Sequence, residues 1–86
     1  DEVACMLHET LRRNRLSVPK DFSLISFDNS SLATLGGMSL SSVAYPFREI
    51  GRTAAGQLVS CLAEGKAMEG RLFAPRLVER DSVKSL

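Results

Sequence analysis

The chain has 86 residues, and its 11 Lys and Arg against 10 Asp and Glu give a formal net charge of +1 at pH 7. This balance excludes a strongly basic surface that would bind nucleic acid through many phosphate contacts. No apolar run is long enough to span a bilayer. The two cysteines, Cys5 and Cys61, lack the spacing of a metal site, and no secretory segment is visible, which favours a cytoplasmic protein.

Residues 1–14 are predicted to form a helix, because apolar residues such as Val3 and Leu7 recur at near-helical spacing. Asp1 is placed to cap its start, and Asn14 or Arg15 to end it. The basic cluster at its end, formed by Arg12, Arg13 and Arg15, is typical of cations that complement the helix dipole.

Residues 22–27 are predicted to form a short buried strand of a parallel sheet. Residues 28–39 form a polar connection with one short helical turn near Leu32 and Leu35, and residues 40–45 a second strand. The order of helix, turn and strand indicates part of a βαβ unit and therefore an α/β fold.

Residues 47–64 give the clearest helical pattern, with Pro46 able to open the helix and Gly65 to end it. Gly51 and Gly56 weaken it by about 1 kcal/mol each relative to Ala, which predicts a close packing contact at one of them at least. Two further short strands are expected at 71–74 and 77–79, separated by Pro75.

Three ordered motifs carry a family resemblance. They are LSVPKDFSLISFDN (16–29), LSSVAYPFREIGRTAAGQLVSCLAEGK (40–66) and FAPRLVERDSV (73–83). Together they resemble the C-terminal part of the effector-binding domain in the lactose/galactose repressor family of bacterial transcription regulators. Ser26 stands where the family usually has Gly, Ser41 and Ser42 replace a Thr pair, and residues 36–39 replace a segment that often contains proline.

The resemblance implies an α/β chain that is the C-terminal fragment of a two-lobed periplasmic-binding-protein-like fold, with parallel sheets flanked by helices. Residues 1–43 and 76–86 would belong to the C-terminal lobe, and residues 44–75 to the N-terminal lobe. DNA would be contacted only through an N-terminal domain that this chain does not contain. The implied function is to sense a small-molecule effector, such as a sugar, and to couple its binding to operator DNA binding by a homodimer.

Asp28 is the strongest candidate for a ligand-binding residue. From the residues alone, a turn Asp that satisfies nearby backbone N–H groups is slightly favoured. The resemblance reverses that order, because Asp28 matches the family's acidic residue that accepts hydrogen bonds from the effector. An ionised carboxylate suits this role since it offers several strong acceptor sites.

Phe47 and Tyr45 are the other candidates for ligand contacts. An aromatic residue at a helix start is more often part of a core, but the matching position of Phe47 in the family often lies in the cleft between lobes, where a ring can cover a sugar or a base. Tyr45 is expected in the same cleft. The resemblance also implies side-by-side dimers, with Cys5, His8 or Leu35 near the twofold axis.

No enzyme is expected, since the only His, His8, is mid-helix and no Ser or Cys is placed as a nucleophile with an oriented base. No metal site is expected, because the two cysteines lack metal-type spacing, and no cofactor is expected, because Gly36 and Gly37 lack the context of a phosphate-binding loop. The alternative functions are a periplasmic-type solute-binding protein of a transporter and, without any supporting motif, a small α/β enzyme. Residues upstream of Asp1 would separate the first two, since a helix-turn-helix indicates a regulator and a secretory signal a transport receptor.

Overall fold

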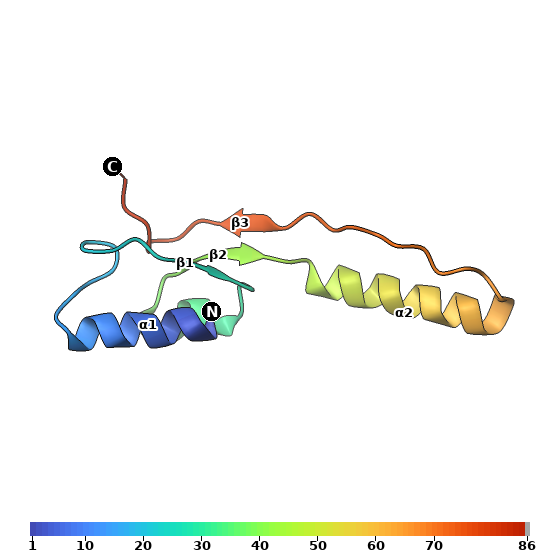
Figure 1. Ribbon diagram of the computed structural model, residues 1–86, viewed down its shortest axis with the longest axis horizontal. Helices are drawn as coiled ribbons and strands as arrows, with labels where there is room; N and C mark the ends of the chain where they lie inside the picture. Colours follow the sequence, from blue (N-terminus) through green and yellow to red (C-terminus); the bar gives the residue numbers. More distant parts are fainter. Residues whose placement is uncertain (86) are drawn as a thin grey trace. The chain divides into compact units, whose positions relative to one another are not determined.

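The computed structural model describes residues 1–85, which form two compact units of the chain. Unit 1 consists of Asp1–Ala44 and the segment from Arg76 onward, and unit 2 is Tyr45–Pro75. The elements, labelled in Figure 1, are α1 (Glu2–Arg13), β1 (Ile25–Phe27), the 3₁₀ helix η1 (Ser31–Gly37), β2 (Ser41–Ala44), α2 (Phe47–Glu64) and β3 (Arg76–Val78). No helix within residues 1–85 is long and apolar enough to cross a membrane.

Unit 1 is built around a small mixed sheet with the strand order β1-β2-β3. β1 and β2 run parallel, with Ser26 opposite Ser42, and β2 pairs with β3 antiparallel, with Val43 opposite Leu77. The helices and the parallel pair confirm the predicted α/β class. The antiparallel β3 follows from the path of the chain, which leaves unit 1 after β2 and returns to it beside the same strand.

A small apolar core holds α1 and η1 together in unit 1. Ala4, Ala33 and Leu40 are buried, and partly buried Cys5 and Met38 pack against them. The connection between the parallel strands therefore contains the short helical turn that the sequence predicts, although it is a 3₁₀ helix with a kink at Leu35 and Gly36. Small side chains let α1 approach this turn closely, which brings the start of α1 next to the ends of β1 and β2.

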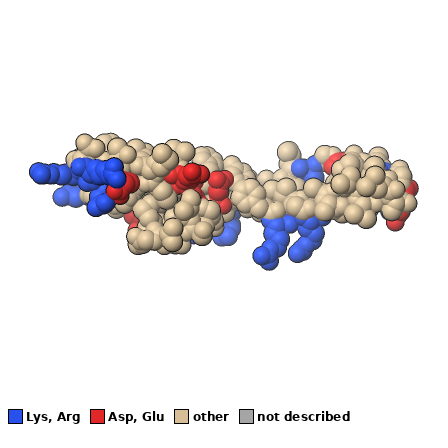
Figure 2. All heavy atoms as spheres, turned by 90° about the horizontal axis from the view of Figure 1, so that it is seen from below, with Lys and Arg blue, Asp and Glu red and all other residues tan. Residues whose placement is uncertain are grey.

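The α1 helix ends as predicted near Asn14, but the left-handed residue is Arg15, with φ 59°, and not Asn14, with φ −95°. Figure 2 shows Lys and Arg side chains gathered at this end of unit 1. Arg12 and Arg13 both donate hydrogen bonds to Glu9, one turn earlier. The hydrogen bond from Arg12 is the main cause that lowers the pKa of the Glu9 carboxyl, but the pair lies at the surface, where solvent screens it, so it stabilises the fold little.

Two predicted strands are shorter than their apolar patterns suggest. Residues 22–24 lie outside β1 because the preceding turn continues to Phe22, whose backbone N–H, like that of Asp21, donates to the carbonyl of Ser17. Leu40 lies outside β2 because its backbone N–H donates to Ala33 in η1 at 2.9 Å. The expected strand 77–79 is observed one residue earlier, as β3.

Unit 2 consists of α2 and the segment that follows it. Gly65 ends α2 in the left-handed conformation, with φ 67° and its N–H on the carbonyl of Cys61, so both predicted ends of this helix are confirmed. No residue of α2 is buried, and a Cβ at Gly51 or Gly56 would meet nothing within 4 Å among residues 1–85. The close packing expected at these glycines is therefore not found among residues 1–85.

The predicted strand at 71–74 is wrong for the described part of the chain. This segment follows α2 through side-chain contacts: Arg71 donates to Glu49 at 3.2 Å, and its guanidinium lies 4.7 Å from the centre of the Phe73 ring. Strand geometry needs a neighbouring backbone with which to exchange hydrogen bonds, and residues 1–85 pair no strand with it.

Candidate functional site

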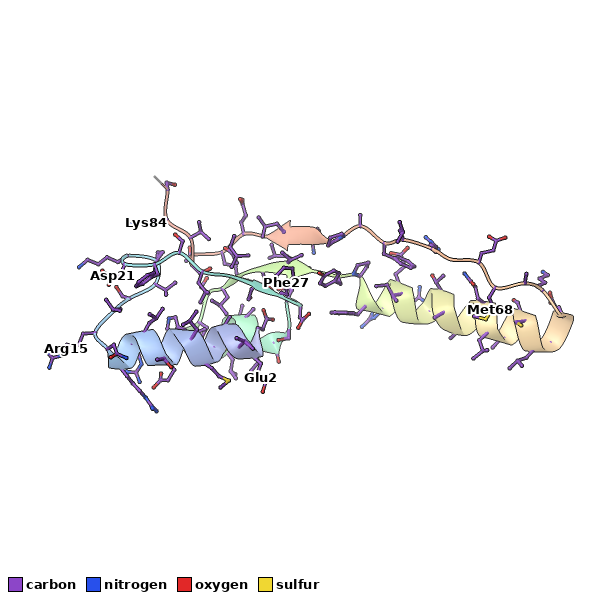
Figure 3. All side chains as sticks on the ribbon, in the orientation of Figure 1. Glu2, Arg15, Asp21, Phe27, Met68 and Lys84 are labelled. Atoms are coloured by element: carbon purple, nitrogen blue, oxygen red, sulfur yellow. The ribbon has the colours of Figure 1, made fainter. Side chains whose placement is uncertain are left out.

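The turn after β1 contains two consecutive non-glycine residues in an uncommon backbone conformation. Asp28 directly follows Phe27, the last residue of β1, which is labelled in Figure 3. Asp28 and Asn29 both have positive φ angles, 98° and 50°. Such residues cost about 1–3 kcal/mol each and persist where their surroundings hold them in place, often at functional sites. The turn lies at the carboxyl end of a parallel strand, which is where α/β sheets bind ligands.

Backbone and side-chain hydrogen bonds hold this turn against β2. The Asp28 N–H donates to the carbonyl oxygen of Val43 at 2.8 Å, which extends the β1–β2 pairing by one residue. The Asn29 N–H donates to the hydroxyl of Ser42 at 2.9 Å. Ser42 is fully buried, so the turn is fixed on a rigid part of the sheet.

Arg80 holds the same turn from the other end of the chain. Its guanidinium donates to the Asn29 side-chain oxygen at 2.6 Å and to the carbonyl oxygen of Leu40 at 2.7 Å. Its backbone N–H donates to the Ser41 hydroxyl at 2.9 Å. The planar guanidinium thus bridges the segment after β3, the start of β2 and the turn after β1.

A buried carboxylate, that of Asp1, completes the support. It accepts hydrogen bonds from the hydroxyls of Ser26 and Ser42, at 2.5 and 2.8 Å, and from both the backbone N–H and the hydroxyl of Ser30. Asp1 occupies the N-cap position of α1, but its side chain makes no capping bond. The interpretation of Asp1 as a helix-capping side chain is therefore wrong, because four donors outside α1 bind the carboxylate.

The Asp28 carboxylate itself is exposed and makes no hydrogen bond or ion pair with any residue in 1–85. Its backbone is held on one side by Val43 and on the other by the anchored Asn29. This arrangement leaves an ionised acceptor on a fixed turn, which suits a ligand with hydroxyl or amine donors.

Tyr45 and Phe47 lie in unit 2, at the start of α2. Their ring centres are 5.7 Å apart with an interplanar angle of 44°, an ordinary aromatic pair. Phe47 is 56% exposed and Tyr45 is half-buried. The local geometry thus pairs the two predicted aromatic ligand residues and leaves the larger part of the Phe47 side chain uncovered in this chain.

The three residues predicted near a dimer axis differ in exposure. Leu35 is 62% exposed at the kink of η1. His8 is half-buried on α1, so it is less exposed than the sequence suggests. Cys5 packs against the core of unit 1, and its thiol lies 3.7 Å from the carbonyl oxygen of Leu32.

Sequence reasoning missed Arg80, Asn29 and the serines around Asp1 as parts of one network. Arg80 and Ser82 stand in the third motif, at its Arg and Ser, and Ser82 also bonds across the sheet to Leu24 and Ser41. The signal was therefore present as a motif, but partners separated by as many as 58 positions could not be paired without the fold. Within residues 1–85, no three His, Cys, Asp or Glu side chains are grouped so as to hold a metal ion.

Comparison with known proteins identifies this architecture. The profile of the periplasmic binding protein-like domain matches residues 1–83. The chain belongs to this family, in the form found as the effector domain of LacI-type bacterial transcription regulators.

Two curated relatives are named as transcriptional repressors. The arabinose metabolism transcriptional repressor of Geobacillus stearothermophilus is 32% identical over the whole chain, which covers 24% of that protein. The HTH-type transcriptional repressor PurR of Vibrio cholerae is 35% identical, again over the whole chain and 26% of the relative. The chain thus spans about a quarter of the length of these curated relatives.

Two solved structures agree. The Escherichia coli transcriptional repressor ascG superposes with a TM-score of 0.85 at 29% identity, over 99% of this chain and 31% of its own. A sugar-binding LacI-family regulator from Escherichia coli, complexed with phosphate, gives a TM-score of 0.81 at 30% identity, over 96% of this chain and 30% of its own. By their names, these relatives and structural neighbours are transcriptional regulators.

The Asp1 network makes a prediction about stability. Asp1→Ala in the full-length protein leaves several buried donors without an acceptor, so the free energy of unfolding should fall by about 3 kcal/mol or more. Urea unfolding monitored by circular dichroism measures this change. Glu2→Ala, at an exposed position next to it, should change stability by less than about 1 kcal/mol. Equal effects of the two substitutions would contradict the central role of Asp1.

The positive φ at Asp28 makes a second prediction. Glycine adopts this conformation freely and alanine does not, so Asp28→Gly should be more stable than Asp28→Ala by about 1 kcal/mol. The comparison uses urea unfolding of the two full-length variants. An Asp28→Ala variant as stable as Asp28→Gly would mean that Asp28 does not hold the left-handed conformation in solution.

Proposed function

We propose that this chain is part of the effector-sensing domain of a bacterial transcriptional repressor and that Asp28 binds the effector. The observation that carries this proposal is the anchored turn at the carboxyl end of β1, which presents an unpaired carboxylate. Relatives that are transcriptional repressors supply the context in which such a site would act. A cytoplasmic location accords with this function.

In the complete domain, we assign residues 1–43 and 76–86 to the C-terminal lobe and residues 44–75 to the N-terminal lobe. The division of the chain into two compact units supports this assignment. Asp28 would face the cleft between the lobes, and Phe47 and Tyr45 would contribute aromatic surface to it.

The proposed effector is a small polar metabolite, with a sugar as the first candidate. A carboxylate binds hydroxyl donors strongly, and an aromatic ring covers the apolar face of a sugar ring. One relative is named for arabinose metabolism and one structural neighbour is described as sugar-binding. L-arabinose, D-galactose and D-glucose are therefore suitable first probes.

The proposed mechanism is a shift between two lobe orientations. A ligand that binds one orientation more tightly raises its population, and the shift cannot exceed the differential affinity. A homodimer would pass this change to DNA-binding domains elsewhere in the full-length protein, and through them to operator DNA.

The proposed dimer surface includes the exposed face of α1 and η1. Leu35, Val3 and Met6 are 62%, 77% and 65% exposed, and apolar side chains of this size favour burial in an isologous interface. His8 would lie near its edge. Cys5, which packs inward, would support the surface from below.

Asp28→Ala tests the ligand site. Removing an acceptor that binds hydroxyl groups should weaken sugar binding by about 1.5–3 kcal/mol. Calorimetric titration of the full-length protein with the three sugars measures the affinity, and Asp28→Gly serves as a second variant that relieves the backbone strain. If a sugar binds both folded variants as tightly as the parent, Asp28 is not part of the site.

Leu35→Asp tests the dimer. The substitution removes the stabilisation from burying a leucine side chain, about 1.5–3 kcal/mol, and adds the cost of desolvating a carboxylate. The dissociation constant of the dimer should therefore rise at least about tenfold. Sedimentation equilibrium of the full-length protein measures the dissociation constant. Leu35→Met keeps the apolar volume and should leave it unchanged. A dimer undisturbed by Leu35→Asp would place the interface elsewhere.

A further inference from the structure

The side-chain amide of Asn29 has a hydrogen-bond partner for its oxygen but none for its NH₂ group within residues 1–85. Its oxygen accepts the hydrogen bond from Arg80 at 2.6 Å. Its NH₂ group makes no hydrogen bond with any residue in 1–85. Because no buried side-chain nitrogen or oxygen of the described residues lacks a partner, this NH₂ group reaches the surface.

Arg80 decides which way this amide faces. A guanidinium has donors and no acceptor, so only the oxygen of the Asn29 amide can face it. The second Arg80 bond, to the carbonyl oxygen of Leu40, fixes the guanidinium itself. The amide therefore presents its donor half on the side away from Arg80.

We propose that Asn29 is a second ligand-binding residue, which donates from its NH₂ group, and that Arg80 is the positioning residue that orients it. Asp28 and Asn29 are adjacent in one turn, so the turn offers an acceptor and a donor together. This pair fits a ligand in which one hydroxyl donates and a neighbouring hydroxyl accepts, as in a monosaccharide. The inference rests on the proposed effector site and specifies how that site recognises its ligand.

Asn29→Asp tests the NH₂ donor without removing the hydrogen bond to Arg80. Aspartate tolerates the left-handed conformation and keeps an oxygen for Arg80, so the turn stays anchored. The donor is lost, and a second carboxylate stands beside Asp28. Affinity for the sugar that binds the parent protein, among L-arabinose, D-galactose and D-glucose, should fall at least about fivefold.

Arg80→Met removes the guanidinium that binds the Asn29 side chain and keeps an apolar side chain similar in length to the arginine stem. In the full-length protein, hydrogen–deuterium exchange at residues 28–30 should accelerate about tenfold or more, because the turn loses the bond that holds the Asn29 side chain and then opens more often from the acceptors of its backbone N–H groups. Exchange in α2 should stay as in the parent. Sugar affinity should fall as well, and Arg80→Lys, which keeps one charged donor, should restore part of both effects. Arg76→Met, at an exposed position of β3, is the matched control and should change neither.

The outcomes separate this inference from the proposed function. Unchanged sugar affinity in Asn29→Asp would exclude Asn29 as a donor, and unchanged exchange at 28–30 in folded Arg80→Met would exclude Arg80 as its positioning residue. If none of the three sugars binds the parent protein, the sugar assignment fails and the donor role of Asn29 toward a sugar fails with it. The exchange experiment needs no ligand and still decides the role of Arg80.

Discussion

The carboxylate of Asp1 is the interaction on which unit 1 depends. It joins the start of α1 to β1 through Ser26, to the turn after β1 through Ser30, and to β2 through Ser42. A buried carboxylate is tolerable only when its acceptor sites are filled, and here four donors fill them. The apolar core of unit 1 is small, so this polar network supplies specificity that larger apolar side chains would supply in another fold.

This network also explains how two consecutive residues keep positive φ angles. The buried Ser42 hydroxyl donates to the Asp1 carboxylate and accepts from the Asn29 N–H. The same hydroxyl therefore holds the turn after β1 and joins the start of α1 to the sheet. Ser30 is held by Asp1 immediately after Asn29, and Val43 binds Asp28 immediately before it. The strain at the turn is thus balanced by bonds on three sides, and Asp28 remains the member of the turn whose side chain is unpaired in residues 1–85.

In unit 2, local backbone geometry and not a buried network sets the helix boundaries. α2 buries no residue, yet it has the helix boundaries that Pro46 and Gly65 predict, because these two residues act through local backbone geometry. Leu58, Val59 and Leu62 are between 49% and 78% exposed. Their apolar surface is typical of a helix that packs on further elements.

The sequence by itself determined the two α-helices, the position of the turn after β1 and the family. The extents of α1 and α2, the order of the strands along the chain and the placement of Asp28 after β1 follow from periodicity, turn residues and motif order, all of which act over a few positions. The tertiary structure decided which residues meet. The Asp1 carboxylate is a buried acceptor and not a helix cap. Arg80 donates a hydrogen bond to Asn29, which lies 51 positions earlier in the sequence. Residues 71–74 do not form a strand, because no neighbouring backbone within the described chain pairs with them. Local propensity limits the conformation of each segment, but a hydrogen bond between distant side chains exists only once the fold has brought them together.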